Sequence, residues 1–355
     1  MIQSHKKIAF WLLSGCFLVF LMVIIGGITR ATGSGLSITE WNIVTGTFPP
    51  LNEQDWLGTF DKYKHSPQFL LLNAGFGLNE FKSIFWWEYV HRLLGRVIGL
   101  TFLLPFFYFL FTKQIQAPLR KKLLFLLALG TLQGFLGWFM VKSGLVNLPQ
   151  VSHYRLAIHL VMAFLIFGFA FHLALGLLYP VQKQTLSRVR KIENAAWAIF
   201  FLSLLQIIYG ALVAGLHGGT VYNTFPKMGS GWVPPEVTSL FPSWKNLTEN
   251  LVTVQFIHRC MAWLLLLLAG LLWFFSTKSK ALSAPQTKAV HVFLFLLTLQ
   301  FSLGILTLLS SVILPLAILH QAGAFFLFAG ILHLLHRLRE TGDIQKPSDS
   351  IMIGF

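Results

Sequence analysis

Charged residues are scarce in this chain of 355 residues: only 11% are Asp, Glu, Lys or Arg, whereas 55% are hydrophobic. A soluble domain carries roughly 25% charged residues, so this composition excludes an ordinary soluble globule. Cysteine is almost absent too, since Cys16 and Cys260 are the only 2 and both lie within apolar runs. Their positions exclude a disulfide between loops and a CxxC metal or redox site.

Long apolar runs are what the chain has instead. A helical run crosses a hydrocarbon core of about 30 Å if it supplies about 20 residues. We therefore predict an all-α integral membrane protein with eight transmembrane helices and two outer loops, at about 29–85 and 215–250. The helices are expected at roughly 8–28, 86–112, 120–141, 152–179, 193–214, 251–276, 286–309 and 313–338.

The net charge of +15 is distributed in short basic clusters between the apolar runs. This arrangement does not favour nucleic acid, whose binding needs basic residues gathered on one face. Under the positive-inside rule the clusters mark the cytoplasmic side, and both termini are predicted there. The clusters are Lys6-Lys7, Arg120–Lys122, Arg188–Lys191, Lys278–Lys288 and Arg337–Arg339.

An internal repeat relates the two halves of the chain. Residues 89–92 (YVHR) correspond to 256–259 (FIHR), and Leu132-Gln133 corresponds to Leu299-Gln300, both at an offset of 258 − 91 = 167. Four crossings return a chain to its starting side, so the repeat is parallel and predicts two pseudo-symmetric four-helix bundles. We assign the N-terminal half to 1–180, the C-terminal half to 181–340 and a cytoplasmic tail to 341–355.

Four of the 12 histidines occupy equivalent places in the repeat: His91 and His159 in the first half, His258 and His320 in the second. Within each half both come from helices that begin outside, so they are expected at similar depth. Two facing imidazoles can supply both axial bonds to a haem iron. The alternatives are buried histidines bonded to backbone carbonyls, a quinone site, or zinc, which lacks a third convergent ligand.

Arginines near the outer surface support a haem site. Arg92 and Arg259 directly follow two of these histidines, and Arg30, Arg96 and Arg155 lie at a similar level, where the positive-inside rule gives no reason for them. Arginine forms bidentate bonds with carboxylates, so these side chains are candidates to bind haem propionates. The alternative is that they extend to the membrane interface.

Glu88 precedes His91 by three residues and is expected on the same helical face. The equivalent position of the second half carries Gln255, which predicts that the two halves differ in role. Glu88 is a candidate to accept a proton or stabilise developing positive charge. The alternative is a carboxylate paired with Arg92.

Several motifs together resemble the haem A synthase family, in particular the branch shared by proteobacteria and mitochondria. The resemblance covers nearly the whole chain except the C-terminal tail. The other branch of the family has a cysteine pair in the first outer loop, which this chain lacks. The motifs are GGITRATGSGLSITEW (26–41), FPPLNEQDW (48–56), FKSIFWWEYVHRLLGR (81–96), LQGFLGWFMVKSGL (132–145), VSHYRLAIHL (151–160), YNTFPKMG (222–229), TVQFIHR (253–259) and LAILHQ (316–321).

The resemblance implies an enzyme that oxidises a methyl group of haem O to a formyl group through a hydroxymethyl stage. It places the substrate haem O at His91 and His159 and a haem b cofactor at His258 and His320. The acidic residue three before the first histidine is functional in the family, and Glu88 occupies that position.

The partners that the resemblance implies are haem O, membrane lipid, haem O synthase and an electron acceptor. A homo-oligomer is also consistent with the resemblance. The implied location is the inner membrane of a bacterium rather than of a mitochondrion. Two alternatives remain open: a two-haem cytochrome that exchanges electrons with quinone, and a haem transporter or chaperone.

Overall fold

The computed structural model describes the chain except for residues 1, 43–44, 147, 181–186, 279–280 and 340–355. Within the described residues, eight helices are long and apolar enough to cross a membrane, which confirms the predicted all-α membrane fold. Each is longer than the roughly 20 residues that a crossing requires. The eight are α1 (Ile2–Ala31), α4 (Leu78–Phe111), α5 (Ala117–Ser143), α6 (His153–Leu178), α7 (Ser187–Gly215), α8 (Leu251–Lys278), α9 (Ala284–Leu309) and α10 (Leu314–Leu338).

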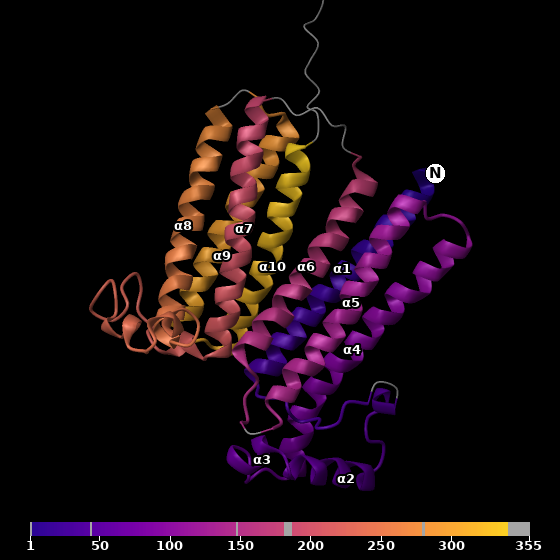
Figure 1. Ribbon diagram of the computed structural model, residues 1–355, viewed down its shortest axis with the longest axis vertical. Helices are drawn as coiled ribbons and strands as arrows, with labels where there is room; N and C mark the ends of the chain where they lie inside the picture. The colour runs from indigo at the N-terminus through magenta and orange to yellow at the C-terminus, as the bar shows by residue number, and fades with distance from the viewer. Residues whose placement is uncertain (1, 43–44, 147, 181–186, 279–280, 340–355) are drawn as a thin grey trace, which may run out of the picture.

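The helices gather into two groups in chain order, with α1, α4, α5 and α6 in one and α7, α8, α9 and α10 in the other (Figure 1). Between the groups, α1 packs against α10, α7 packs against α6, and α6 packs against α10. The first two contacts are equivalent if the repeat relates α1 to α7 and α6 to α10. The packing is therefore consistent with two pseudo-symmetric bundles.

Aromatic side chains form the centre of the core between the groups. The rings of Phe167 on α6 and Phe325 on α10 have centroids 4.1 Å apart, and Phe164 contacts both Phe325 and Phe328. Phe200 on α7 stacks on Phe328 with centroids 5.6 Å apart. Because lipid is as apolar as these side chains, close packing rather than escape from water holds such helices together.

The first outer segment, loop 1 (32–77), contains two helices that we did not predict, α2 (Glu53–Lys64) and α3 (Pro67–Leu71). Asn52 caps α2 by accepting a bond from the Asp55 N–H, 2.8 Å away, an interaction worth about 1 kcal/mol. Both helices lie at the end of the molecule opposite the N-terminus (Figure 1).

Helix α2 packs on the first turns of α4 through an aromatic cluster. The cluster contains Trp56, Phe60, Tyr63, Phe81, Ile84, Phe85 and Tyr89, all buried. Because α4 contributes residues to this cluster, it begins at Leu78, eight residues before the predicted start at 86. The prediction of that start was wrong because these turns pack against loop 1 as well as continuing the apolar run.

The second outer segment, loop 2 (216–250), contains three short 3-10 turns, at Gly218–Thr220, Pro235–Thr238 and Ser243–Leu247. The Asn250 amide organises it by donating to the Glu236 carbonyl at 2.7 Å and to Asn246 Oδ1 at 2.8 Å. The predicted boundary between the halves at 180 and 181 adjoins residues outside the described part of the chain, and the predicted tail 341–355 lies entirely outside it. The division into two functional halves stays a prediction.

Candidate functional site

The four histidines of the repeat lie on four different helices: His91 on α4, His159 on α6, His258 on α8 and His320 on α10. All four side chains are half-buried. His159 and His320 each stand six residues after the first residue of their helix, and His258 stands seven after. His91 stands 91 − 78 = 13 residues after the start of α4, because α4 extends outward to meet loop 1.

Each imidazole packs on a glycine of a neighbouring helix. A Cβ placed on Gly26 would lie 3.0 Å from His91 Nε2, and one on Gly137 would lie 3.0 Å from His159 Cε1. In the second half, a Cβ placed on Gly210 would lie 3.2 Å from His258 Cε1, and one on Gly304 would lie 3.0 Å from His320 Cε1. Glycine is needed at these positions because any larger residue would push the ring away.

The two histidines of each half are brought together, as the repeat predicts. His91 and His159 lie within electrostatic range of each other, and so do His258 and His320. The contacts between helices produce this pairing, because α1 packs against both α4 and α6, and α7 packs against both α8 and α10. Each bundle therefore holds one pair of imidazoles from two separate helices.

This donor set fits a haem better than a bare metal ion. His159 Nδ1 and His258 Nδ1 are buried and have no hydrogen-bond partner within the described residues. A buried ring nitrogen without a partner is costly, and an axial bond to iron would satisfy such an atom. Among the described residues, no group of three or more His, Cys, Asp or Glu side chains could hold a metal ion, and zinc requires at least three such ligands.

Three glutamines that we did not predict as site residues bond to three of the histidines. Gln133 Nε2 donates to the His159 carbonyl at 3.1 Å, and Gln300 Nε2 donates to the His320 carbonyl at 2.9 Å. Gln133 and Gln300 are equivalent in the repeat, which was the signal that could have identified them. Gln206 Nε2 donates to the His258 carbonyl at 3.1 Å, and no repeat relationship pointed to it.

Glu88 is buried, with 2% of its surface exposed, and accepts three hydrogen bonds. Ser37 Oγ and the Ile38 N–H donate to Oε2, at 2.7 and 2.9 Å. Arg92 Nη2 forms an ion pair with Oε1 at 2.7 Å. The alternative that we considered for Glu88, pairing with Arg92, is therefore present in the structure, and the carboxylate also ties loop 1 to α4.

The arginines that follow two of the histidines hold the outer loops. Arg92 donates to the carbonyls of Ile38 and Glu40 in loop 1, at 2.8 and 2.7 Å. Arg259 Nη2 donates to three carbonyls of loop 2, those of Thr224, Pro226 and Lys227. Each guanidinium thus fastens a loop next to its histidine, a role that the sequence did not indicate.

Gln255, the counterpart of Glu88, donates to the Tyr222 carbonyl at 3.2 Å and so also joins its helix to the adjacent loop. The pair of Gln255 and Arg259 therefore repeats the attachment made by Glu88 and Arg92. The second attachment has one carboxylate fewer, which makes it less negative by one charge.

The remaining candidate arginines have different surroundings. Arg155 Nη1 donates to the Phe139 carbonyl at 2.7 Å, and its guanidinium lies 3.7 Å from the centre of the Phe139 ring. Arg259 Nη1 is buried without a hydrogen-bond partner among the described residues, which leaves a donor suited to an anionic group such as a propionate. Arg30 lies close enough to His217 in loop 2 to lower the pKa of that imidazole, although burial of His217 is the larger cause.

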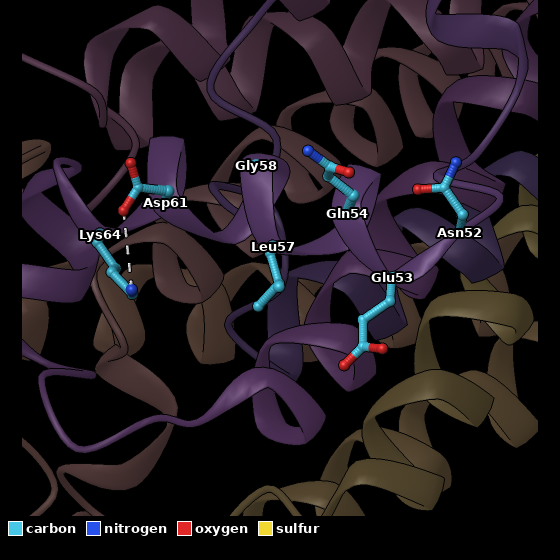
Figure 2. Close-up of a pocket in the computed structure, with 7 residues that line it drawn as sticks. All are labelled: Asn52, Glu53, Gln54, Leu57, Gly58, Asp61 and Lys64. Atoms are coloured by element: carbon cyan, nitrogen blue, oxygen red, sulfur yellow. Dashed lines mark ion pairs between the residues drawn. The ribbon is translucent and has the colours of Figure 1, made fainter.

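A surface pocket on α2 does not include the candidate site residues (Figure 2). Its lining comes from one side of α2 and the residue before it, and contains none of the candidate histidines or arginines: Asn52, Glu53, Gln54, Leu57, Gly58, Asp61 and Lys64. The ion pair between Lys64 and Asp61 at 3.7 Å is a surface contact of little energetic value. The paired histidines therefore remain the candidate site.

Comparison with known proteins identifies the family of the chain. Residues 9–332 match the family model COX15-CtaA, described as cytochrome oxidase assembly protein. The chain is 46% identical over 338 residues to a protein of Nitrosomonas eutropha named Heme A synthase, with 95% of both chains covered. Proteins of the same name from Flavobacterium psychrophilum and Nitrosospira multiformis are 47% and 48% identical, covering 94% of this chain and 99% and 94% of theirs. The chain therefore belongs to the cytochrome oxidase assembly protein family.

Proposed function

We propose that this protein is a haem A synthase, a membrane enzyme that oxidises a methyl group of haem O to the formyl group of haem A through a hydroxymethyl stage. The observation that carries the proposal is the pair of histidines within electrostatic range of each other in each bundle, with each ring packed on a helical glycine. Membership of the family and the relatives named Heme A synthase support the same activity.

We assign the substrate haem O to the N-terminal half, with His91 and His159 as axial ligands. The resident haem b belongs to the C-terminal half, with His258 and His320 as ligands, and there it supplies one-electron transfer. The difference between Glu88 and its counterpart Gln255 supports unequal roles, because among the described residues only the first half has a buried carboxylate close in sequence to a candidate histidine.

The reaction requires an electron acceptor. With water as the source of oxygen, a methyl group and one water molecule give a formyl group, four protons and four electrons. The electrons must leave the protein, so a membrane electron acceptor is a necessary partner. Haem O synthase, which would supply the substrate, is a second expected partner, and a homo-oligomer is compatible with this scheme.

Glu88 contributes to the proposed reaction mainly as a fixed negative charge. Its Oε2 already accepts from Ser37 and Ile38, and its Oε1 accepts from Arg92. A fixed charge stabilises positive character that develops on a substrate carbon without needing to reorganise. Acceptance of a proton at Oε1 would instead have to compete with the Arg92 donor.

The arginines are proposed to serve the propionates in two ways. Arg259 can donate directly through its unpartnered Nη1, and Arg30 and Arg155 add positive charge at the outer end of the helices. Arg92 acts mainly by fixing loop 1. We place the protein in a bacterial cell membrane with both termini in the cytoplasm, because the basic clusters occur in the segments that alternate with loops 1 and 2 along the chain, and the positive-inside rule assigns such segments to the cytoplasm.

The deciding experiment is expression in a bacterium that makes haem O, followed by extraction of haems and measurement of their mass. We expect haem A and its hydroxymethyl precursor from the wild type. His91→Ala and His159→Ala should stop product formation, whereas His258→Ala and His320→Ala should deplete haem b. His291→Ala on α9, which lies outside both pairs, is the matched control.

Two outcomes would contradict the proposal. A purified protein that contains only haem b and makes neither product would favour the two-haem cytochrome, since the same paired histidines suit it. Haem O that is bound and released unchanged would favour a transporter. The reverse pattern among the histidine variants would exchange the roles of the two halves.

A further inference from the structure

Three of the four histidines are held by a glutamine amide from a neighbouring helix, and His91 is the exception. Gln133, Gln206 and Gln300 donate to the backbone carbonyls of His159, His258 and His320. Two of these amides also reach an imidazole nitrogen: Gln206 Nε2 lies 3.3 Å from His258 Nε2, and Gln300 Nε2 lies 3.1 Å from His320 Nδ1. Within the described residues, no side chain donates a hydrogen bond to His91.

Counted from the glycine that each histidine contacts, Met22 occupies the place of Gln206. Gln206 stands four residues before Gly210, the glycine that His258 contacts, and Met22 stands four residues before Gly26, the glycine that His91 contacts. Met22 also faces α4, because its terminal methyl would lie 3.2 Å from a Cβ on Gly95, one turn after His91. A methionine fills this position without offering the hydrogen-bond donor that Gln206 provides.

The His91 ring also packs differently. The other three rings turn their Cε1 edge toward their glycines, at 3.0 to 3.2 Å, whereas His91 turns its Nε2 and Cδ2 edge toward Gly26, at 3.0 and 3.4 Å. In the part of the chain that the structure describes, the His159 ring has no amide beside it either, because Gln133 bonds only to the His159 carbonyl, but His91 alone lacks both kinds of glutamine contact and is turned relative to its equivalents. His91 is therefore the least fixed of the four. Interactions that orient a ligand histidine typically change metal affinity by about 10–100-fold.

We propose that His91 is the labile ligand through which haem enters and leaves the N-terminal site, and that Gln206 is a positioning residue that keeps haem resident in the C-terminal site. The inference rests on the proposed function, in which substrate and product must exchange in one half while haem b remains in the other. An exchange site needs one ligand that turns away easily, and a resident site needs both ligands held.

The test measures the release of haem in two backgrounds, each of the full chain with one site left. His258→Ala with His320→Ala leaves the N-terminal site, and His91→Ala with His159→Ala leaves the C-terminal site. Each protein is loaded with iron protoporphyrin IX, and the transfer of this haem to excess apomyoglobin is followed by absorbance. We expect the N-terminal site to release haem at least tenfold faster.

Two reciprocal substitutions then assign the difference to residues. Met22→Gln should slow release from the N-terminal site, and Gln206→Leu should speed release from the C-terminal site, each by about 10–100-fold. Each substitution made in the opposite background should leave release unchanged, which separates a local effect from general misfolding. If Met22→Gln does not accumulate in the membrane, Gln206→Leu decides the question alone.

Equal release from the two sites, or a C-terminal site that Gln206→Leu does not affect, would overturn the inference. The measurement uses a haem that undergoes no conversion. Failure to make haem A would therefore refute the proposed function and leave the release rates, and the conclusion drawn from them, intact.

Discussion

Replacement of Glu88 by alanine should loosen the attachment of loop 1 to α4 and increase the population in which loop 1 is open. The substitution removes the acceptor of Ser37, Ile38 and Arg92 and leaves the guanidinium, whose side chain is only 11% exposed, without its counter-charge. Breaking a buried ion pair by removing one partner costs about 3–5 kcal/mol. Glu88→Gln also removes the counter-charge of Arg92 but keeps an acceptor for Ser37 and Ile38, so it should cost less, about 1.5–3 kcal/mol.

Limited trypsin digestion measures this difference, because Lys62 and Lys64 lie in α2 and become susceptible when loop 1 opens. Cleavage follows the open population when opening is fast, and about 1.4 kcal/mol corresponds to a tenfold change. We therefore expect Glu88→Ala to be cut at least about 100-fold faster than the wild type, and Glu88→Gln at least about tenfold faster.

The matched control is Gln255→Ala, which removes one neutral bond of loop 2, worth about 0.5–1.5 kcal/mol, and should not change cleavage in loop 1. If Glu88→Ala is cut at the wild-type rate, the three bonds of Glu88 do not hold loop 1 and the reasoning fails.

Two further predictions concern the glycines that contact the histidine rings and the pKa of His217 in loop 2. Gly137→Ala places a methyl 3.0 Å from the His159 ring and should weaken haem binding in the N-terminal half, measured by absorbance titration, whereas Gly134→Ala on the same helix meets nothing within 4 Å and should leave binding unchanged. Arg30→Gln should raise the pKa of His217 only part of the way toward its usual value of about 6.5, because burial, the larger cause of the lowered pKa, remains. Folding favours the neutral form of His217, so the contribution of His217 to stability is present above its usual pKa of about 6.5 and is lost as the pH falls below it. An NMR titration measures the pKa of His217. If Arg30→Gln leaves that pKa unchanged, Arg30 does not lower it.

The membrane helices and the histidine pairs could be predicted from the sequence because both depend on local or repeated patterns. Helix α2 was missed although its signal was present: Asn52 is a capping residue, and Trp56, Phe60 and Tyr63 recur at helical spacing. We predicted a loop there because the segment is rich in Gly, Pro, Trp and Asn, a composition typical of loops. Aromatic residues spaced by three and four deserve more weight than composition in such a segment.

The glutamine contacts were harder to predict, because they depend on the axial offset between neighbouring helices. Gln206 and His258 are 52 residues apart in the chain, and their contact requires α7 and α8 to pack at one particular level. Local sequence does not determine that level. The repeat identifies Gln133 and Gln300 only as equivalent to each other, and does not indicate which atoms they contact.

The attachment of loop 1 limits how Glu88 can take part in chemistry. Its Oε2 already accepts two hydrogen bonds, the full capacity of its lone pairs, whereas Oε1 accepts one and has a single site left beside Arg92. A substrate can therefore approach Glu88 only through Oε1, next to a guanidinium that is itself fixed by the carbonyls of Ile38 and Glu40. Any movement of loop 1 shifts these partners together, so the position of the charge on Glu88 and the closure of loop 1 form one structural unit.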